Sequence, residues 1–170
     1  PYLFLVGFGD GTVGVFDTRR KGLMVSSAQL PLPSAMLEGA RQRVVAMAIN
    51  CSGGLLALGT SHGVVQVYPL GSAMQQGGSV HSHDAPSSSP LPFDDCFGRP
   101  LMSWSYSDWS AARALAFHPT IPSELSVGGG VGDGAIRTVC AHSGRLLAMV
   151  RTGSQVAQLA YSADGSHLVS

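Results

Sequence analysis

The sequence predicts an all-β fold, a β-propeller fragment of roughly three four-stranded antiparallel blades. Three observations indicate it: pairs of glycines recur along the chain, alternating apolar residues follow each pair, and 22 glycines and 10 prolines supply many turns. Alternation with a period of two is typical of a strand with one buried face. Many short strands joined by turns therefore account for most of the chain.

The repeated unit is a hairpin with a glycine at each end of its turn. In three places a glycine, three other residues and a second glycine precede the alternating segment; these pairs are Gly7 and Gly11, Gly59 and Gly63, and Gly130 and Gly134. Their first glycines are 52 and 71 residues apart. Both intervals exceed the ~40–45 residues of a WD-type propeller blade. We therefore expect one repeated blade with insertions between its copies.

Further strands lie between the glycine pairs. Apolar segments typical of strands occupy 22–30, 44–50, 55–60, 112–119, 124–130 and 145–152, and a fourth copy of the pattern begins within 156–170. Four short strands per unit, repeated along the chain, indicate antiparallel blades.

One interruption divides the chain. Residues 71–100 are rich in Gly, Ser and Pro, have no periodicity, and are typical of a flexible loop between blades. We therefore expect the end of one blade plus one full blade in 1–70, an inter-blade insert in 71–111, and a full blade plus the start of the next in 112–170. The chain opens as if inside a strand, so we also expect further chain at both ends.

Composition and charge argue against several classes of function. The formal net charge is zero and there is no basic stripe, so nucleic acid is not an expected partner. No apolar run approaches the roughly 20 residues that cross a bilayer, and no signal peptide is visible, so no membrane role is expected. Three widely spaced cysteines argue against a disulfide framework. We expect a protein of the nucleus and cytoplasm.

One segment matches a catalytic motif. Gly59-Thr60-Ser61-His62-Gly63 fits the G-x-S-x-G pattern of a hydrolase nucleophile elbow. That elbow joins a strand to a helix, whereas residues 64–68 are mostly β-branched and alternating, and predict a second strand. The equivalent turns of the other copies contain no serine. A hairpin turn is therefore favoured over a catalytic Ser61.

Two other segments could bind a ligand. The glycine-rich run at 128–134 could cradle a phosphate, but a strand follows it, without the lysine and hydroxyl residue of a phosphate loop. His81, His83 and Asp84 could ligate a metal, but they lie in the insert without a second ligand pair. His118 is expected to hydrogen-bond the edge of its blade. We expect no enzymatic activity, cofactor, metal or small-molecule ligand.

The last third of the chain carries a more specific pattern. It combines the glycines at 128–130, Asp133, Ile136-Arg137, Thr-Gly-Ser-Gln-Val at 152–156 and Leu-Val-Ser at 168–170. This combination closely resembles the middle blades of the Fizzy and Fizzy-related proteins, the WD-repeat activators of the anaphase-promoting complex. Weaker similarity upstream, at 16–20 and 37–60, extends the resemblance over about blades two to five.

The resemblance implies a function in cell division. Such activators bind degron peptides and bring substrates to the ubiquitin ligase, so the implied partners are anaphase-promoting complex subunits and degron-bearing proteins. The chain departs from the family at the strand-end tryptophan, which is replaced by Phe16, Tyr68 and Val139. It also has Thr60-Ser61-His62 where the family has an Asn-Asp-Asn turn that helps to receive a peptide of Lys-Glu-Asn type.

The candidate contacts lie on the predicted loops. A propeller presents its loops as a rigid rim that suits short extended peptides, and the loops between blades should share a face with the glycine turns. Their polar residues Arg43, His62, Asp133 and Gln155 are the candidate peptide-binding residues. The structural alternatives are that Asp133 caps its turn and that Gln155 hydrogen-bonds the adjacent blade.

Two other functions stay open from the residues. A generic WD-repeat scaffold for protein–protein interaction would use the same blades. Its variant, a substrate receptor of the cullin-4 ligase, is indicated by Phe16-Asp17-Thr18-Arg19, which fits the aromatic-Asp-x-Arg pattern of that family at a blade end. A hydrolase that uses Ser61 is the third and least favoured hypothesis.

Overall fold

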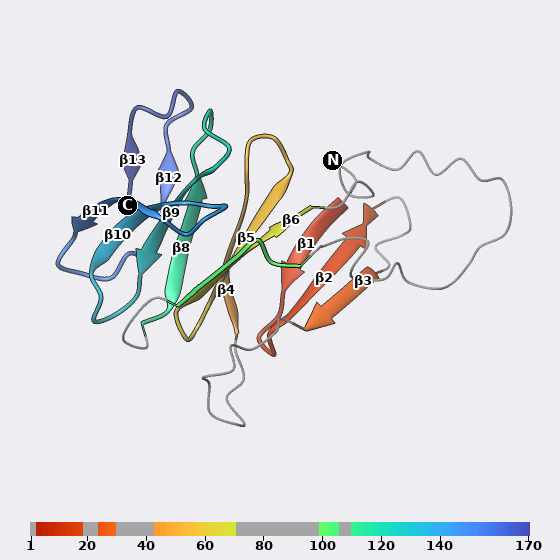
Figure 1. The fold of residues 1–170 in the computed structure, drawn as a ribbon. Helices are drawn as coiled ribbons and strands as arrows, with labels where there is room; N and C mark the ends of the chain where they lie inside the picture. The colour runs from red at the N-terminus through yellow and green to blue at the C-terminus, as the bar shows by residue number, and fades with distance from the viewer. Residues whose placement is uncertain (1–2, 19–23, 30–42, 71–98, 106–109) are drawn as a thin grey trace, which may run out of the picture.

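The fold is built entirely of strands in the part of the chain that the structure describes. The computed structural model describes residues 3–18, 24–29, 43–70, 99–105 and 110–170 (Figure 1). These residues contain thirteen strands in four antiparallel sheets and no α-helix. The predicted all-β class is confirmed.

The sheets follow one another along the chain, and in each of them sequential strands are neighbours. The first contains β1 (Leu3–Gly7), β2 (Thr12–Asp17) and β3 (Met24–Gln29). The second contains β4 (Val44–Ile49), β5 (Leu55–Thr60), β6 (Val64–Pro69) and β7 (Met102–Ser105). The third contains β8 (Ala112–Phe117), β9 (Glu124–Gly129), β10 (Ala135–Cys140) and β11 (Leu146–Arg151). The fourth pairs β12 (Ala160–Tyr161) with β13 (Leu168–Val169).

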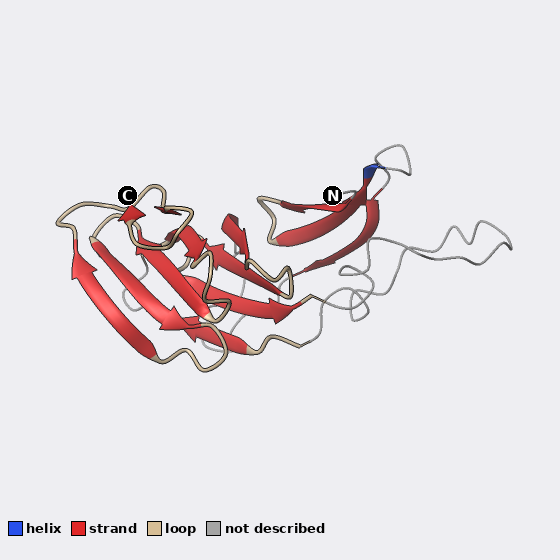
Figure 2. Cartoon of the chain, turned by 90° about the horizontal axis from the view of Figure 1, so that it is seen from above, coloured by secondary structure: helices blue, strands red, loops and turns tan. Residues whose placement is uncertain are grey.

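The sheets pack on one another as successive blades. Figures 1 and 2 show the first sheet at one end of the described chain and the third and fourth sheets at the other. Strand β4 contacts β1 on one side and β8 on the other, and β8 in turn contacts β12. Each blade thus covers a face of the next, as expected for a radial stack.

The middle blade buries both of its faces. Along β5, Leu56 and Leu58 belong to the core shared with the first sheet, whereas Leu55 and Ala57 belong to the core shared with the third. All six residues of β5 are therefore buried. The sequence pattern predicted a strand with one buried face. The second buried face arises because a neighbouring blade lies on each side, which local alternation does not report.

At three glycines, a residue of the following blade packs directly against the strand backbone. A Cβ at Gly7 would collide with the Val44 side chain, one at Gly59 with the Ala112 carbonyl, and one at Gly128 with the Val156 side chain. The neighbouring blade approaches the backbone at all three positions, so only glycine fits without displacement. These three contacts make Gly128, rather than Gly130, the structural equivalent of Gly59.

The second glycine of each pair has a different role. Gly11, Gly63 and Gly134 have φ angles of 87°, 74° and 54°, in the left-handed region. Each lies in a turn between two paired strands of its blade, β1 and β2, β5 and β6, or β9 and β10, where glycine adopts this conformation without steric cost. The turn at 130–134 is two residues longer than the turn at 61–63, since Gly128 pairs with Ile136 and Gly59 with Val65.

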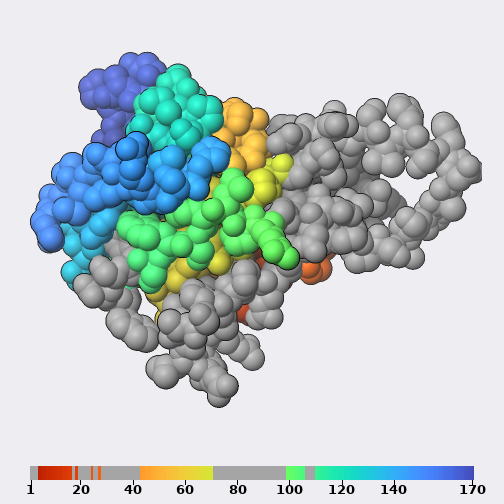
Figure 3. Space-filling model, viewed as in Figure 1, coloured from red at the N-terminus to blue at the C-terminus, as the bar shows by residue number. Residues whose placement is uncertain are grey.

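The outer strand of the second blade lies where the sequence predicted only an insert. Strand β7 pairs with β6, with Val64 opposite Ser105 and Val67 opposite Met102. The Met102 side chain belongs to the core between the second and third blades and approaches Gly144. Figure 3 shows residues 99–105, in green, against the blue surface of the third blade. The full blade assigned to 1–70 therefore takes its fourth strand from the range 71–111.

Polar groups also join the third and fourth sheets. The Tyr161 hydroxyl on β12 lies 2.7 Å from the Ser126 hydroxyl on β9, and the Tyr161 ring meets the His118 ring edge-on, with the ring centres 4.9 Å apart. His118 Nδ1 accepts hydrogen bonds from the backbone N–H groups of Thr120 and Ile121. The His118 ring thus holds the loop that follows β8, whereas the sequence predicted a hydrogen bond to the edge of the blade.

Candidate functional site

The Ser61 segment is a hairpin turn. Strand β6 begins at Val64, directly after the turn, so the strand–turn–helix context of a nucleophile elbow is absent. The Ser61 N–H donates to the Arg43 carbonyl at 2.9 Å, and the Arg43 N–H donates to the Ser61 hydroxyl oxygen at 3.1 Å. That hydroxyl also lies 3.1 Å from His62 Nδ1. The predicted turn is confirmed, and its serine fastens the chain that enters β4.

These bonds bring two of the four candidate residues together. Arg43 precedes β4, and His62 lies in the β5–β6 turn, so Ser61 lies between them in the hydrogen-bonded arrangement. Arg43 is exposed and His62 is half-buried. The Ser61 hydroxyl thus links the backbone of Arg43 to the side chain of His62.

The other two candidates line one cavity. A cavity of about 400 Å³ opens between the β9–β10 turn and the chain that leaves β11. Its lining consists of Val131, Gly132, Asp133, Gly134, Arg151, Gly153, Ser154 and Gln155. Asp133 and Gln155 thus line the same cavity. Arg43 and His62 are not among the residues that line it.

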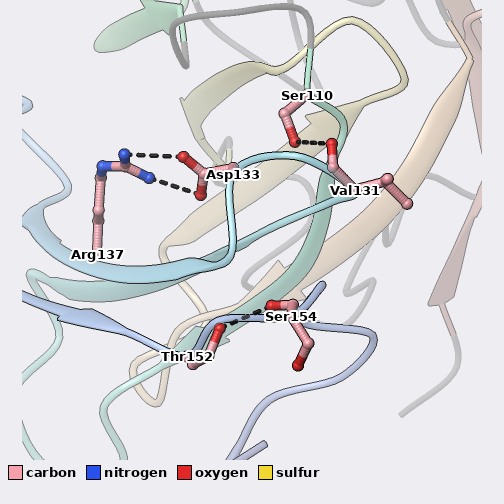
Figure 4. Close-up of polar contacts among 6 residues, drawn as sticks. All are labelled: Ser110, Val131, Asp133, Arg137, Thr152 and Ser154. Carbon is pink, nitrogen blue, oxygen red and sulfur yellow. Dashed lines mark hydrogen bonds and ion pairs between the residues drawn. The ribbon is translucent and has the colours of Figure 1, made fainter.

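Asp133 is held by an internal ion pair. Its two carboxylate oxygens accept hydrogen bonds from Arg137 Nη1 and Nη2 at 2.8 and 2.9 Å, a bidentate arrangement (Figure 4). The side chains of Arg137 and Asp133 are only 15% and 10% exposed. Charge-assisted pairs of this geometry are among the stronger hydrogen bonds in proteins. Asp133 therefore braces the β9–β10 turn and has little capacity left for a ligand.

Hydrogen bonds fix both walls of the cavity. The Gly134 carbonyl accepts from the N–H groups of Thr152 and Gly153, which ties the β9–β10 turn to the chain after β11. The Thr152 hydroxyl donates to the Ser154 carbonyl at 2.7 Å, and the Ser110 hydroxyl donates to the Val131 carbonyl at 3.3 Å (Figure 4). Backbone bonds on both sides make this a pre-formed site, as ligand cavities usually are.

Sequence reasoning missed Arg151 as a member of the site, and it placed Val131 on the same face without assigning it a contact. Arg151 ends β11, and its pairing opposite Ala135 places it beside the turn. Val131 is 77% exposed although it is apolar. The only sequence signal for Arg151 was a charge immediately before Thr152, where an apolar strand ends. Such a charge more often faces solvent, so the residue type alone did not indicate a site.

Potential metal ligands and thiols were located among the residues that the structure describes. Among them, no group of three His, Cys, Asp or Glu side chains is placed to hold a metal ion. His81, His83 and Asp84 lie outside the described residues. Cys140, the last residue of β10, has its pKa lowered, chiefly by a hydrogen bond from the Ser143 side chain and then by nearby backbone N–H groups. No helix in the described part of the chain is long and apolar enough to span a membrane.

Comparison with known proteins finds relatives that are similar to part of the chain. It is 48% identical over 61 residues to Cell division cycle 20.4, cofactor of APC complex, from Arabidopsis thaliana, and equally so to Cell division cycle 20.5 from the same plant. The chain is similar to the Cell division cycle 20 cofactors. The matches span 36% of this chain and 14% of each relative. The resemblance to the Fizzy and Fizzy-related activators is confirmed over this part. No family model matches the chain.

Solved structures confirm the architecture. A chain in the crystal structure of a mitotic checkpoint complex superposes with a TM-score of 0.62 at 24% identity, over 93% of this chain and 39% of that one. The Cps50 (Swd1) β-propeller domain of Myceliophteria thermophila superposes with a TM-score of 0.65 at 11% identity, over 93% and 42%. Both likenesses concern the fold. The described blades form part of a WD-repeat β-propeller, and like the Cell division cycle 20 match they span only part of the longer proteins.

Proposed function

We propose that this chain belongs to a substrate-recruiting WD-repeat activator of the anaphase-promoting complex, which binds degron peptides and brings their proteins to the ligase. The observation that carries the proposal is the 48% identity to relatives whose names describe a cofactor of the APC complex. The role also needs no chemistry from the chain itself, and we expect no enzymatic activity. A protein with this role acts in the nucleus and the cytoplasm.

The loop cavity supports a peptide as the ligand. It is pre-formed, it is lined by backbone and amide groups as well as by apolar Val131, and it lies between the β9–β10 turn and the chain that leaves β11. Gln155 is exposed at this cavity, and its amide can donate to and accept from a peptide backbone. We therefore assign direct contact to Gln155, and to Arg43 and His62 at the neighbouring turn. Asp133 supports the site by keeping the β9–β10 turn in place.

Co-precipitation tests the proposal. Tagged protein should capture anaphase-promoting complex subunits from a dividing-cell extract and should bind a fluorescent destruction-box peptide. Replacing Gln155 with alanine should weaken peptide binding, whereas Gln158→Ala, at an exposed glutamine outside the cavity, should not. Failure to capture the ligase and to bind the peptide would leave a generic WD-repeat scaffold as the better hypothesis.

The cullin-4 receptor is the second candidate. It rests on the sequence pattern from Phe16 to Arg19, of which Arg19 lies outside the described residues. A pull-down with the cullin-4 adaptor separates the two hypotheses, because charge reversal at Arg19 should abolish capture only if this pattern binds the adaptor.

A further inference from the structure

We propose that His118 is a proton-sensitive switch: protonation of its ring releases the loop at 119–123, which ties three neighbouring blades together. The inference goes beyond the proposed function. The loop lies at the start of β9, whereas the cavity lies beyond the end of that strand, so the switch acts on the opposite side of the blade.

The His118 ring is bonded to its loop through a single nitrogen atom. Nδ1 accepts hydrogen bonds from the backbone N–H groups of Thr120 at 3.2 Å and Ile121 at 3.1 Å, and the Thr120 hydroxyl lies 3.3 Å from the same atom. A backbone N–H group can only donate, so Nδ1 carries no hydrogen and the neutral ring has its proton on Nε2. Only 9% of His118 is exposed, so water has little access to replace these bonds.

A proton on Nδ1 is incompatible with this arrangement. An imidazolium ring donates from both nitrogens, so a protonated Nδ1 would face two N–H donors without an acceptor between them. Unsatisfied donors in a buried place are costly, and the loop must therefore leave the ring when the proton binds. The bonds are thus present at higher pH and are lost as the pH falls. Histidine side chains ordinarily change charge between about pH 5 and 8, so this range is the one to examine.

The loop and the ring connect three blades. The Pro122 carbonyl accepts a hydrogen bond from Asn50 Nδ2, in the β4–β5 turn of the second blade, at 3.2 Å. On the other side, the His118 ring meets the Tyr161 ring of β12 edge-on, with the ring centres 4.9 Å apart. A Cβ at Gly165, in the β12–β13 turn, would collide with the same ring. Release of the loop from His118 therefore affects a contact between the second and third blades as well as the third blade itself.

Each strand or turn packed against the ring also brings a titratable group. Burial raises the pKa of Tyr161 on β12, so its hydroxyl stays neutral in this range. Hydrogen bonds from two neighbouring serines lower the pKa of Asp164 in the β12–β13 turn to about 2, so its carboxylate stays ionised. The other two groups are Glu124, which accepts a hydrogen bond from the Tyr161 hydroxyl, and His167, which ends the same turn. Both require control variants.

Hydrogen exchange of the Thr120 and Ile121 amides in the complete chain tests the inference. If protonation opens the loop, the protection factors of both amides should fall about tenfold for each pH unit over part of the range from pH 7 to 5. In His118→Asn, the side-chain carbonyl replaces Nδ1 as an acceptor but takes up no proton, so the protection should stay constant with pH. His118→Phe has no acceptor and should leave both amides unprotected at every pH.

Matched variants show whether His118 is the group that titrates. His142→Asn changes an exposed histidine in the turn after β10, and it should keep the pH dependence of the wild type. Glu124→Gln and His167→Asn should keep it too. Constant protection in the wild type from pH 8 to 5, or an unchanged pH dependence in His118→Asn, would overturn the inference. Loss of the dependence in any of the three control variants would assign the proton to another group and would also overturn it. The comparison of the wild type with His118→Asn decides the matter even where His118→Phe does not fold.

Discussion

The Tyr161 hydroxyl lies 2.7 Å from the Ser126 hydroxyl, across the boundary between two blades. It also donates to a Glu124 carboxylate oxygen at 3.2 Å, and the Ser126 hydroxyl lies 2.9 Å from that of Thr138. Ser126 is fully buried. One tyrosine thus closes a hydrogen-bond network that starts on the blade before it.

Removing this hydroxyl should loosen the contact between the blades. We expect Tyr161→Phe to lower the free energy of unfolding by about 1 kcal/mol, because the ring stays against His118 while the hydrogen bonds are lost. Urea denaturation measures the effect. Ser103→Ala, at an exposed serine of β7, should change stability by no more than about 0.5 kcal/mol. Equal midpoints for Tyr161→Phe and the wild type would show that the network contributes nothing.

Gly59 should be the least replaceable of the inter-blade glycines. A methyl group there would press against the Ala112 carbonyl, which belongs to the backbone and cannot turn aside. We expect Gly59→Ala to destabilise the fold by about 1–3 kcal/mol or more, by overpacking. Gly9→Ala is the control, since a Cβ at Gly9 meets nothing within 4 Å. A loss for Gly9→Ala as large as that for Gly59→Ala would contradict the steric account.

Asp133 and Arg137 should behave as a coupled pair. Removing either partner takes a bidentate ion pair away from a side chain that is mostly buried, so Asp133→Ala and Arg137→Ala should each cost about 1–3 kcal/mol. The double variant should cost clearly less than the two losses added together, with a coupling energy of about 1 kcal/mol or more. A complete double-mutant cycle by chemical denaturation measures this. Simple additivity would mean that the bidentate contact makes no net contribution.

Tyr68 should make the second blade sensitive to alkali. Burial raises the pKa of its hydroxyl to about 12, above its ordinary value of 10.0, and that hydroxyl donates to Gln66 Oε1 at 3.2 Å. The folded-state pKa is the higher one, so the stabilisation is fully present below pH 10 and is lost as the pH rises towards 12. Denaturation midpoints should therefore fall more steeply above pH 10 in the wild type than in Tyr68→Phe. Parallel pH profiles would exclude this role.

Asp164 should make the stability of the fold depend on pH in acid rather than in alkali. Hydrogen bonds from the Ser162 hydroxyl and then from Ser166 lower the pKa of its carboxyl group from 3.8 to about 2. The contribution of the carboxylate is present above pH 3.8 and is lost as the pH falls towards 2. Asp164→Asn should be less stable than the wild type at neutral pH, and the two melting curves should converge in acid. A difference that stays constant down to pH 2 would argue against ionisation as its cause.

The turns and central strands were predictable because they depend on local chemistry. Gly63 needs a positive φ and is followed by alternating β-branched residues, so the hairpin can be recognised in a short window. The glycines against which a neighbouring blade packs could not be recognised in this way. Gly128 is explained only by Val156, on the next blade, and nothing in the adjacent sequence reports that approach. The glycine alignment therefore found the right turns but paired Gly59 with Gly130.

In the candidate site, too, some features could be predicted from the local sequence and others could not. Asp133 and Gln155 could be placed on neighbouring loops because each flanks a recognisable turn, and both line the cavity. The ion pair of Asp133 with Arg137 was not foreseen, since either residue alone resembles an ordinary solvated charge. Arg151 joins the cavity only through its strand pairing with Ala135. Whether the four candidate residues contact a peptide stays a prediction.

The late position of β7 in the sequence has a consequence for how the protein is made. The ribosome synthesises β4, β5 and β6 close together, but more than thirty further residues must emerge before Met102 can complete their sheet. Closing so long a connection costs about 1–2 kcal/mol more than closing the short turn before β11. During translation the β6 edge of this blade therefore stays open until β7 has been made, and a chaperone or a second nascent chain can pair with β6 in that period.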